Sequence, residues 1–174
     1  EEQLHKAHIM QAESLQAQMK ADCAAAKTDN ELETLTFDMQ KTLPIPKLST
    51  SIAYYKRQLN LYNLGIHSGS NGKGTFNLWL ETEASKGTQE VGSCLKQYID
   101  RIKKPLKKLI LWSDSCGGQN RSIKLVLMMM FILENHATLE TISMRYLLSG
   151  HSFLPNDTEF ASAETALKQH DNLY

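Results

Sequence analysis

Four acidic side chains stand at positions where they could do chemistry together: Asp38, Glu90, Asp114 and Asp157. Asp114 follows the apolar run LILW at 109–112 and leads into the small and amide residues of SCGGQN. Carboxylates that converge repel one another, which raises their pKa values. Divalent cations remove that cost, and Mg²⁺ is held by hard oxygen ligands of this kind. If the fold gathers these acids, the sequence predicts a carboxylate metal centre.

Each acid also has a structural interpretation when it is taken alone. Asp114 can cap the turn before the helix expected near residue 120, and Asp157 is typical of a helix N-cap or first turn. Glu90 on a helix surface can simply be solvated. Asp38 is harder to explain in this way, because an acid that follows a core strand costs free energy without a partner. The four positions in combination favour the metal site.

The elements that must position these acids follow from hydrophobic periodicity. We expect helices at 1–28, 85–102, 120–135 and 155–170, and strands at 33–40, 57–68, 75–82, 105–114 and 141–150. The helix at 120–135 is nearly apolar throughout, so we expect it to be deeply buried. The stretch TLPIPKLS is broken by prolines and cannot lie inside a sheet.

This order of elements predicts the fold class. Three strands are followed by helix, strand, helix, strand and helix, so we expect an α/β fold with a mixed five-stranded sheet (βββαβαβα) flanked by helices. An extra N-terminal helix precedes it, which divides the chain into a connector helix at 1–29 and one domain at 30–174.

The acids fall at the ends of those elements. Asp38 ends the first strand, Asp114 ends the fourth, Asp157 opens the last helix, and Glu90 lies in the first turns of the helix at 85–102. Ligands of open α/β sheets bind outside the carboxyl ends of the strands. If the first and fourth strands are neighbours, Asp38 and Asp114 point into one cleft.

Five stretches carry a resemblance to a known family: FDMQKTLPIP, YYKRQLNLYNLGIHS, ASKGTQEVGSCL, WSDSCGGQNRSIK and SGHSFLPNDTEF. With the element order, they resemble the ribonuclease H-like superfamily, which includes ribonucleases H, retroviral integrases, DDE/D transposases and junction resolvases. More narrowly, they resemble the transposase-like domain of mobile-element-derived, poorly characterised animal proteins. The resemblance covers residues 31–170.

The resemblance implies a function and a ligand set. Asp38, Asp114 and Asp157 take the positions of the three acidic metal ligands, and Glu90 that of the helix glutamate of ribonucleases H and resolvases. The implied cofactors are two Mg²⁺ or Mn²⁺ ions, and the implied reaction is phosphodiester hydrolysis or strand transfer on DNA. An RNA–DNA hybrid is the other substrate that remains open.

Further residues near the expected site could assist. His151 could orient a water, shuttle a proton or contact the scissile phosphate, or its ring could simply be satisfied by a loop carbonyl. Gln119 and Asn120 could hydrogen-bond sugar or phosphate, or merely shape the turn. Basic side chains that could neutralise phosphate charge are Lys56, Arg57, Lys73, Lys86, Arg121 and Lys124. The basic run RIKKPLKK at 101–108 lies away from the acids and either holds a distal stretch of nucleic acid or is a solvated loop.

Composition restricts the classes of protein. The 174 residues carry nineteen basic and nineteen acidic side chains, so only local charge can argue for a nucleic-acid partner. Three cysteines without CxxC spacing predict neither a disulfide framework nor a zinc site, and favour an intracellular, reducing location. The resemblance to transposase-like domains implies that this location is the nucleus. The longest apolar run, 125–133, is too short for a membrane span.

Two expectations concern partners. The sequence opens without a start methionine and reads as a fragment, so a homo-oligomer could form through the N-terminal helix or through missing domains. The alternative function is a domesticated, non-catalytic module of the same fold that binds nucleic acid or protein. Zero net charge mildly favours protein binding.

Overall fold

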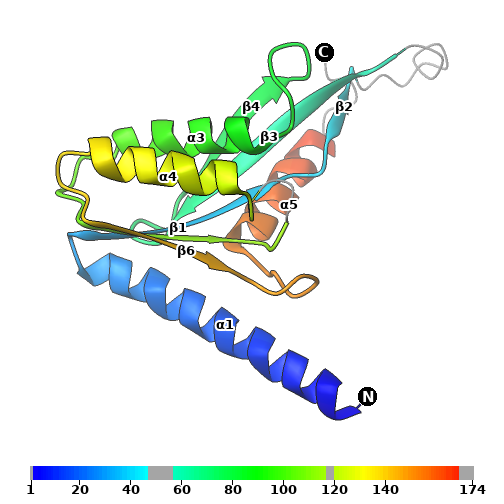
Figure 1. Ribbon diagram of the computed structural model, residues 1–174. Coiled ribbons are helices and arrows are strands. Elements are labelled where there is room, and N and C mark those ends of the chain that lie inside the picture. The colour runs from blue at the N-terminus through cyan, green and yellow to red at the C-terminus, as the bar shows by residue number, and fades with distance from the viewer. Residues whose placement is uncertain (1, 47–56, 117–119, 169–174) are drawn as a thin grey trace.

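The computed structural model describes residues 2–46, 57–116 and 120–168 (Figure 1). The helices are α1 (Glu2–Thr28), α3 (Thr88–Asp100), α4 (Ile123–Asn135) and α5 (Pro155–Lys168). The strands are β1 (Leu32–Met39), β2 (Leu43–Ile45), β3 (Leu59–Ser68), β4 (Gly74–Leu80), β5 (Lys108–Ser113) and β6 (Thr141–Tyr146). The described chain is therefore an α/β protein with a mixed sheet, and each helix and strand expected from periodicity is confirmed with small shifts at its ends.

The sheet is built around β1. This strand pairs antiparallel with β3 on one side and parallel with β5 on the other. Beyond these, β4 pairs antiparallel with β3, and β6 pairs parallel with β5. The path across the sheet is thus β4, β3, β1, β5, β6, with the only parallel pairs of the described strands on the β5 side.

The expected number of strands was one too low, because β2 adds a sixth. β1 pairs with β3 as far as Met39 opposite Leu64, and β2 resumes with Leu43 opposite Leu61. Pro44 lies within β2, which pairs with β3 alone. A three-residue strand is stabilised by its partner rather than by its own periodicity, and proline is tolerated at such an edge.

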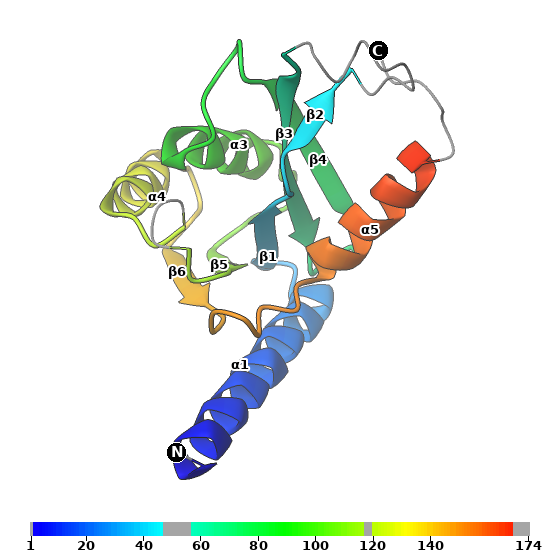
Figure 2. The same cartoon turned by 90° about the vertical axis from the view of Figure 1, so that its right-hand side faces the viewer.

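The two faces of the sheet are covered by different helices. Figure 2 shows α3 and α4 on one side, and α1 and α5 on the other. On β1, Thr34 donates to the Asp22 carbonyl of α1 at 3.0 Å, and Thr36 donates to Asn156 Oδ1 of α5 at 2.6 Å. Because side chains alternate along a strand, Asp38 belongs to this second face.

The main core lies between the sheet and the α3–α4 layer. Its buried strand side chains include Leu35 and Phe37 of β1 and Leu109 and Leu111 of β5. Gly92 of α3 lets α4 come close, since a Cβ there would lie 3.2 Å from Met128 Cγ.

A smaller core lies under α1. Met19 packs with Trp112, Leu147 and Leu154, all buried. Asp22 accepts a hydrogen bond from Trp112 Nε1 at 2.8 Å and pairs with Arg145. The second half of α1 is therefore packed into the domain, whereas its first half extends away from the sheet (Figure 2).

The expectation that the 120–135 helix is deeply buried is wrong. Leu125, Met129 and Ile132 of α4 are buried, but Ile123 and Phe131 are exposed on its outer side. A helix laid on a sheet presents only one stripe of side chains to it, so an all-apolar helix needs a further layer to be covered. The described residues provide no such layer.

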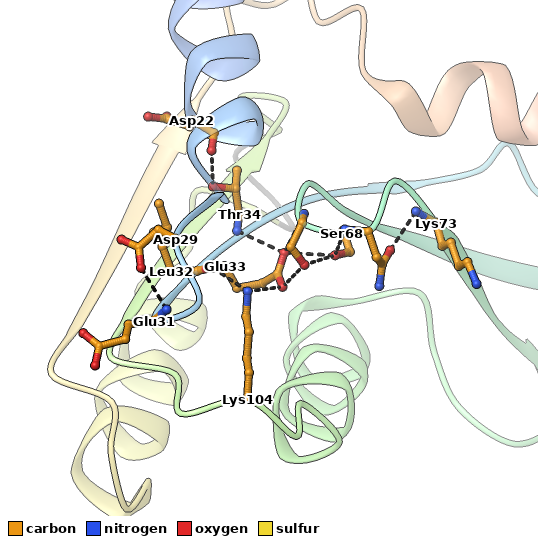
Figure 3. Close-up of polar contacts among 11 residues, drawn as sticks. Asp22, Asp29, Glu31, Leu32, Glu33, Thr34, Ser68, Lys73 and Lys104 are labelled. Carbon is orange, nitrogen blue, oxygen red and sulfur yellow. Dashed lines mark hydrogen bonds and ion pairs between the residues drawn. The ribbon is translucent and has the colours of Figure 1, made fainter. Parts of the chain in front are cut away.

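The end of the sheet remote from Asp38 is closed by a buried carboxylate, Glu33 (Figure 3). It accepts hydrogen bonds from Ser68 Oγ at 2.9 Å and Ser70 Oγ at 2.5 Å, and it pairs with Lys104 Nζ at 3.0 Å. Lys104 also donates to the Leu32 carbonyl. This lysine of the basic run at 101–108 is therefore used inside the fold.

Candidate functional site

Asp38 and Asp114 stand at the carboxyl ends of two adjacent parallel strands. The last aligned pair of β1 and β5 is Thr36 opposite Trp112, and each acid follows two residues later. Trp112 packs against α1, so Asp114, two residues on, continues toward the same face as Asp38. Parallel pairing with this register is why two acids that are far apart in sequence come to one edge.

The raised pKa of Asp38 indicates that both Asp114 and Asp157 lie close to it. Burial raises the pKa of Asp38, the charges of Asp114 and Asp157 raise it further, and the result is about 6. A hydrogen bond from the Met39 amide, at 2.8 Å, and the charge of Lys86 lower the pKa of Asp38 but do not offset this. The three aspartates predicted from the sequence therefore share one electrostatic environment.

Asp157 has the structural role expected of a first-turn acid. Its Oδ2 accepts the amide hydrogen of Leu154 at 2.9 Å, which fixes the chain entering α5. It also lines an open groove of about 260 Å³ together with Asp38, Lys41, Phe160 and Glu164. Asp157 therefore acts at the start of α5 and also shares this groove with Asp38.

Asp114 caps a turn and is itself held in place. Its Oδ1 accepts the Cys116 amide at 3.2 Å and the side-chain amide of Asn120. Asn120 is buried, and its carbonyl accepts the hydroxyl of Tyr146 at 3.2 Å. The sequence left two roles open for Asn120, nucleic-acid contact and shaping of the turn. In the structure its side-chain amide donates to the Asp114 carboxylate and orients it.

The position of α5, and so of Asp157, depends on residues that sequence reasoning missed. Asn156 is fully buried and accepts the Thr36 hydroxyl, which ties the first turn of α5 to β1. Gly65 of β3 makes room for the helix, since a Cβ there would lie 2.7 Å from Phe160 Cζ. The only sequence signal was a polar residue, Asn156, directly before the predicted ligand.

A second link joins α5 to β3. His67 Nδ1 lies 2.7 Å from Glu159 Oε1, and both side chains are largely buried. A Cβ at Gly74 would lie 2.2 Å from Glu159 Oε2, so this glycine leaves space for the carboxylate. The pair helps to fix the rotation of α5 about its axis.

Glu90 lies apart from the three aspartates. It accepts the Ser85 hydroxyl at 3.0 Å and borders a different groove, which Trp79 and Lys124 also line. Burial raises the pKa of Cys94, one turn further along α3, and the charge of Glu90 raises it further. Glu90 is not among the causes of the raised pKa of Asp38. The structure therefore does not bring Glu90 together with the other predicted ligands.

His151 faces α1. Its ring meets that of His8 edge-on, with the centroids 5.2 Å apart, and its carbonyl accepts the side-chain amide of Gln16 at 3.1 Å. These contacts give the residue a structural environment at the start of the segment leading to α5.

The predicted basic residues have different surroundings. Lys86 is close enough to lower the pKa of Asp38, and its Nζ lies 3.4 Å from the Gln40 carbonyl. Arg57 pairs with Glu81 at 3.0 Å, and Arg121 lies over the ring of Tyr146 at 5.5 Å.

Two other basic residues lie farther from the three aspartates. Lys124 lines the groove that Glu90 borders. Lys73 lies in the turn between β3 and β4, at the end of the sheet remote from Asp38. Lys56 and Gln119 lie outside the described residues.

The three aspartates offer carboxylate oxygens, which are the type of ligand atom that a hard divalent cation binds. Carboxylates are the ligands that Mg²⁺ and Mn²⁺ prefer, and repulsion among carboxylates at a partly buried edge is the cost that such a cation removes. Across residues 2–46, 57–116 and 120–168, no three His, Cys, Asp or Glu side chains are already close enough to hold one ion.

Family models and curated proteins were both compared with this chain. No family model matches this chain, and no curated protein matches it either. Among the described helices, none is both long and apolar enough to cross a membrane. Function must therefore be argued from the site itself.

Proposed function

We propose that this chain is a ribonuclease H-like domain that cleaves or joins phosphodiester bonds of DNA with the help of Mg²⁺ or Mn²⁺. One observation carries the proposal: aspartates from β1, the end of β5 and the start of α5 lie so close together that the charges of Asp114 and Asp157 add to the effect of burial and raise the pKa of Asp38 to about 6. A sheet whose central strand is antiparallel to β3 and parallel to β5 is compatible with this fold. A nuclear location is part of the same proposal.

Asp38, Asp114 and Asp157 would hold the ions, which when bound would activate the attacking oxygen and stabilise the leaving oxygen. The rest of the chain contributes rigidity. The Asn120 amide fixes the rotamer of Asp114, and the bond between Thr36 and Asn156 fixes the helix that carries Asp157.

The shape of the site supports a polymeric substrate. Asp38 and Asp157 line an open groove rather than an enclosed cavity, so a strand can pass through without its ends entering. Lys41 lines the groove, and Lys86 lies near Asp38, so the acids have cations beside them. Cationic side chains of this kind neutralise the phosphate charge of a nucleic acid.

A non-catalytic module is the second candidate, and a specific observation favours it. One oxygen of Asp114 is already bonded to Cys116 and Asn120, and one oxygen of Asp157 to Leu154. Such bonds stabilise the fold without any metal, so the two acids would be retained in a binding protein as well.

The test is cleavage in Mn²⁺ of three fluorescent substrates: a DNA duplex, a DNA single strand and an RNA–DNA hybrid. Wild type is compared with Asp114→Asn and with Asp100→Asn, an exposed acid on α3 that pairs with Lys96. Cutting that is lost in Asp114→Asn and kept in Asp100→Asn supports the proposal and identifies the substrate. Absence of cutting on every substrate supports the binding module.

A further inference from the structure

The outer side of α4 carries an apolar surface that nothing in the described chain covers. Ile123 is 71% exposed, Leu127 56%, Met130 60% and Phe131 51%, and Val126 is also exposed. Single exposed apolar residues are ordinary, but a contiguous group of this kind marks an interaction surface. We call these five residues the α4 patch.

The spacing of the patch is that of a helix seam. Ile123, Leu127 and Met130 follow one another at intervals of four and three residues, which places them on one face. The opposite face, with Leu125, Met129 and Ile132, is buried against the sheet. α4 thus has one apolar stripe that packs into the core and a second apolar stripe that faces solvent.

The patch continues into a groove between α3, α4 and β4. This groove has a volume of about 1110 Å³, and Leu78, Trp79, Leu127, Met128 and Phe131 form its apolar walls. Leu78 of β4 is 59% exposed. A partner that covers the α4 patch therefore finds a recess beside it for its own side chains.

We propose that the α4 patch binds the α4 patch of a second copy of this chain, with the two helices antiparallel across a two-fold axis. The charges on α4 favour this occupant. Lys124 lies in the first turn, Glu134 in the last, and both are exposed. With the axis between Leu127 and Met130, Lys124 comes beside the partner subunit's Glu134, and the reverse pair forms by symmetry.

A parallel arrangement would place like charges beside each other, so the sequence of α4 also specifies the direction. The extent of the surface also suits a second copy, because five exposed apolar side chains continue without a break into the walls of the groove.

The dimer does not rest on the proposed function. α4 covers the face of the sheet opposite to α1 and α5, whereas Asp38 belongs to the face that α1 and α5 cover (Figure 2). Two copies joined through α4 would leave both aspartate groups open to solvent.

The test is sedimentation equilibrium of the full chain over a range of concentrations. Wild type is expected to dimerise at micromolar concentrations, and Leu127→Glu and Met130→Glu are expected to be monomers. Both residues are exposed, so circular dichroism should show unchanged folding. Met10→Glu is the matched control, because Met10 is 69% exposed on α1. It should dimerise as wild type does.

A charge exchange tests the antiparallel arrangement separately. Lys124→Glu alone and Glu134→Lys alone should each weaken the dimer about fivefold, and the double variant should restore it. A wild-type monomer at about 100 µM would overturn the proposal. So would a dimer that persists in Leu127→Glu or that Met10→Glu dissociates, because either result would place the interface elsewhere.

Discussion

After burial, the carboxylate of Asp114 at the end of β5 does most to raise the pKa of Asp38, which lies at the end of the neighbouring parallel strand β1. Two acids that lie 76 positions apart in the sequence are therefore so close in the fold that the charge of one raises the pKa of the other. A protein that needed only a stable sheet would gain nothing from this repulsion. It is the strongest sign of function in the chain, and most of the predictions below follow from it.

The first prediction concerns stability and pH in the absence of divalent cations. The pKa of Asp38 is raised from 3.8 to about 6 in the folded state, so folding favours the protonated acid and stability falls as pH rises between these values. Asp38→Asn removes the charge and can still accept the Met39 amide. We expect it to be more stable than wild type by roughly 1–3 kcal/mol near pH 7.

Urea unfolding of both proteins in EDTA measures this effect. Near pH 4 the advantage of Asp38→Asn should vanish, because the wild-type acid is then largely protonated in the folded protein. An advantage of equal size at both pH values would mean that the gain comes from packing rather than from charge.

The second prediction concerns cations. Mg²⁺ or Mn²⁺ should raise the melting temperature of wild type near pH 7, since a ligand that binds only the folded state stabilises it. At ten times the dissociation constant the gain is about 1.4 kcal/mol, which corresponds to roughly 3–6 °C. Asp114→Asn should lose this shift, and Asp100→Asn should retain it. Equal shifts in all three proteins would show that the cation binds elsewhere.

The third prediction concerns Asn120. Asn120→Ala removes the side-chain donor to Asp114 in a buried position, so the free energy of unfolding should fall by about 1–3 kcal/mol. Asn135→Ala is the matched control, because that amide donates to the Phe131 carbonyl from an exposed position. We expect the control to lose less than about 0.5 kcal/mol in chemical unfolding. Equal losses would show that the Asn120–Asp114 bond contributes little.

The fourth prediction concerns the contact between α5 and β3. In Gly65→Ala the new methyl group would lie 2.7 Å from Phe160 Cζ, so the helix must shift, at a cost of roughly 1–3 kcal/mol. Phe160→Leu shortens the opposing side chain and should lose less in the Gly65→Ala background than in wild type. A double-mutant cycle in urea measures this coupling, and additive losses would contradict the crowding argument.

The sequence alone determined the elements and the edge at which the acids lie. Alternation around Leu35 and Phe37, and the apolar run before Asp114, are local patterns that persist in the fold. Because strand ends follow from such patterns, the positions of Asp38 and Asp114 at the carboxyl ends could be predicted. β2 could not be, because three residues around Pro44 are a strand only through their pairing with β3.

The tertiary structure decided where side chains on helices and loops point. Glu90 and His151 were placed near the acids by sequence position, yet Glu90 bonds to Ser85 and borders the α3–α4 groove, while His151 packs on His8 of α1. A one-residue change in the phase of a helix turns a side chain by about 100°, and sequence periodicity does not fix that phase against a neighbouring element.

The same limit applies to burial. The apolar composition of 120–135 could not distinguish a helix covered on both sides from one that keeps an exposed stripe, because that depends on how many layers the fold provides. Local sequence thus determined which residues form strands and which acids end them. Packing between distant segments decided that Asp38, Asp114 and Asp157 share one environment, that Asn120 holds one of them, and that one side of α4 faces solvent.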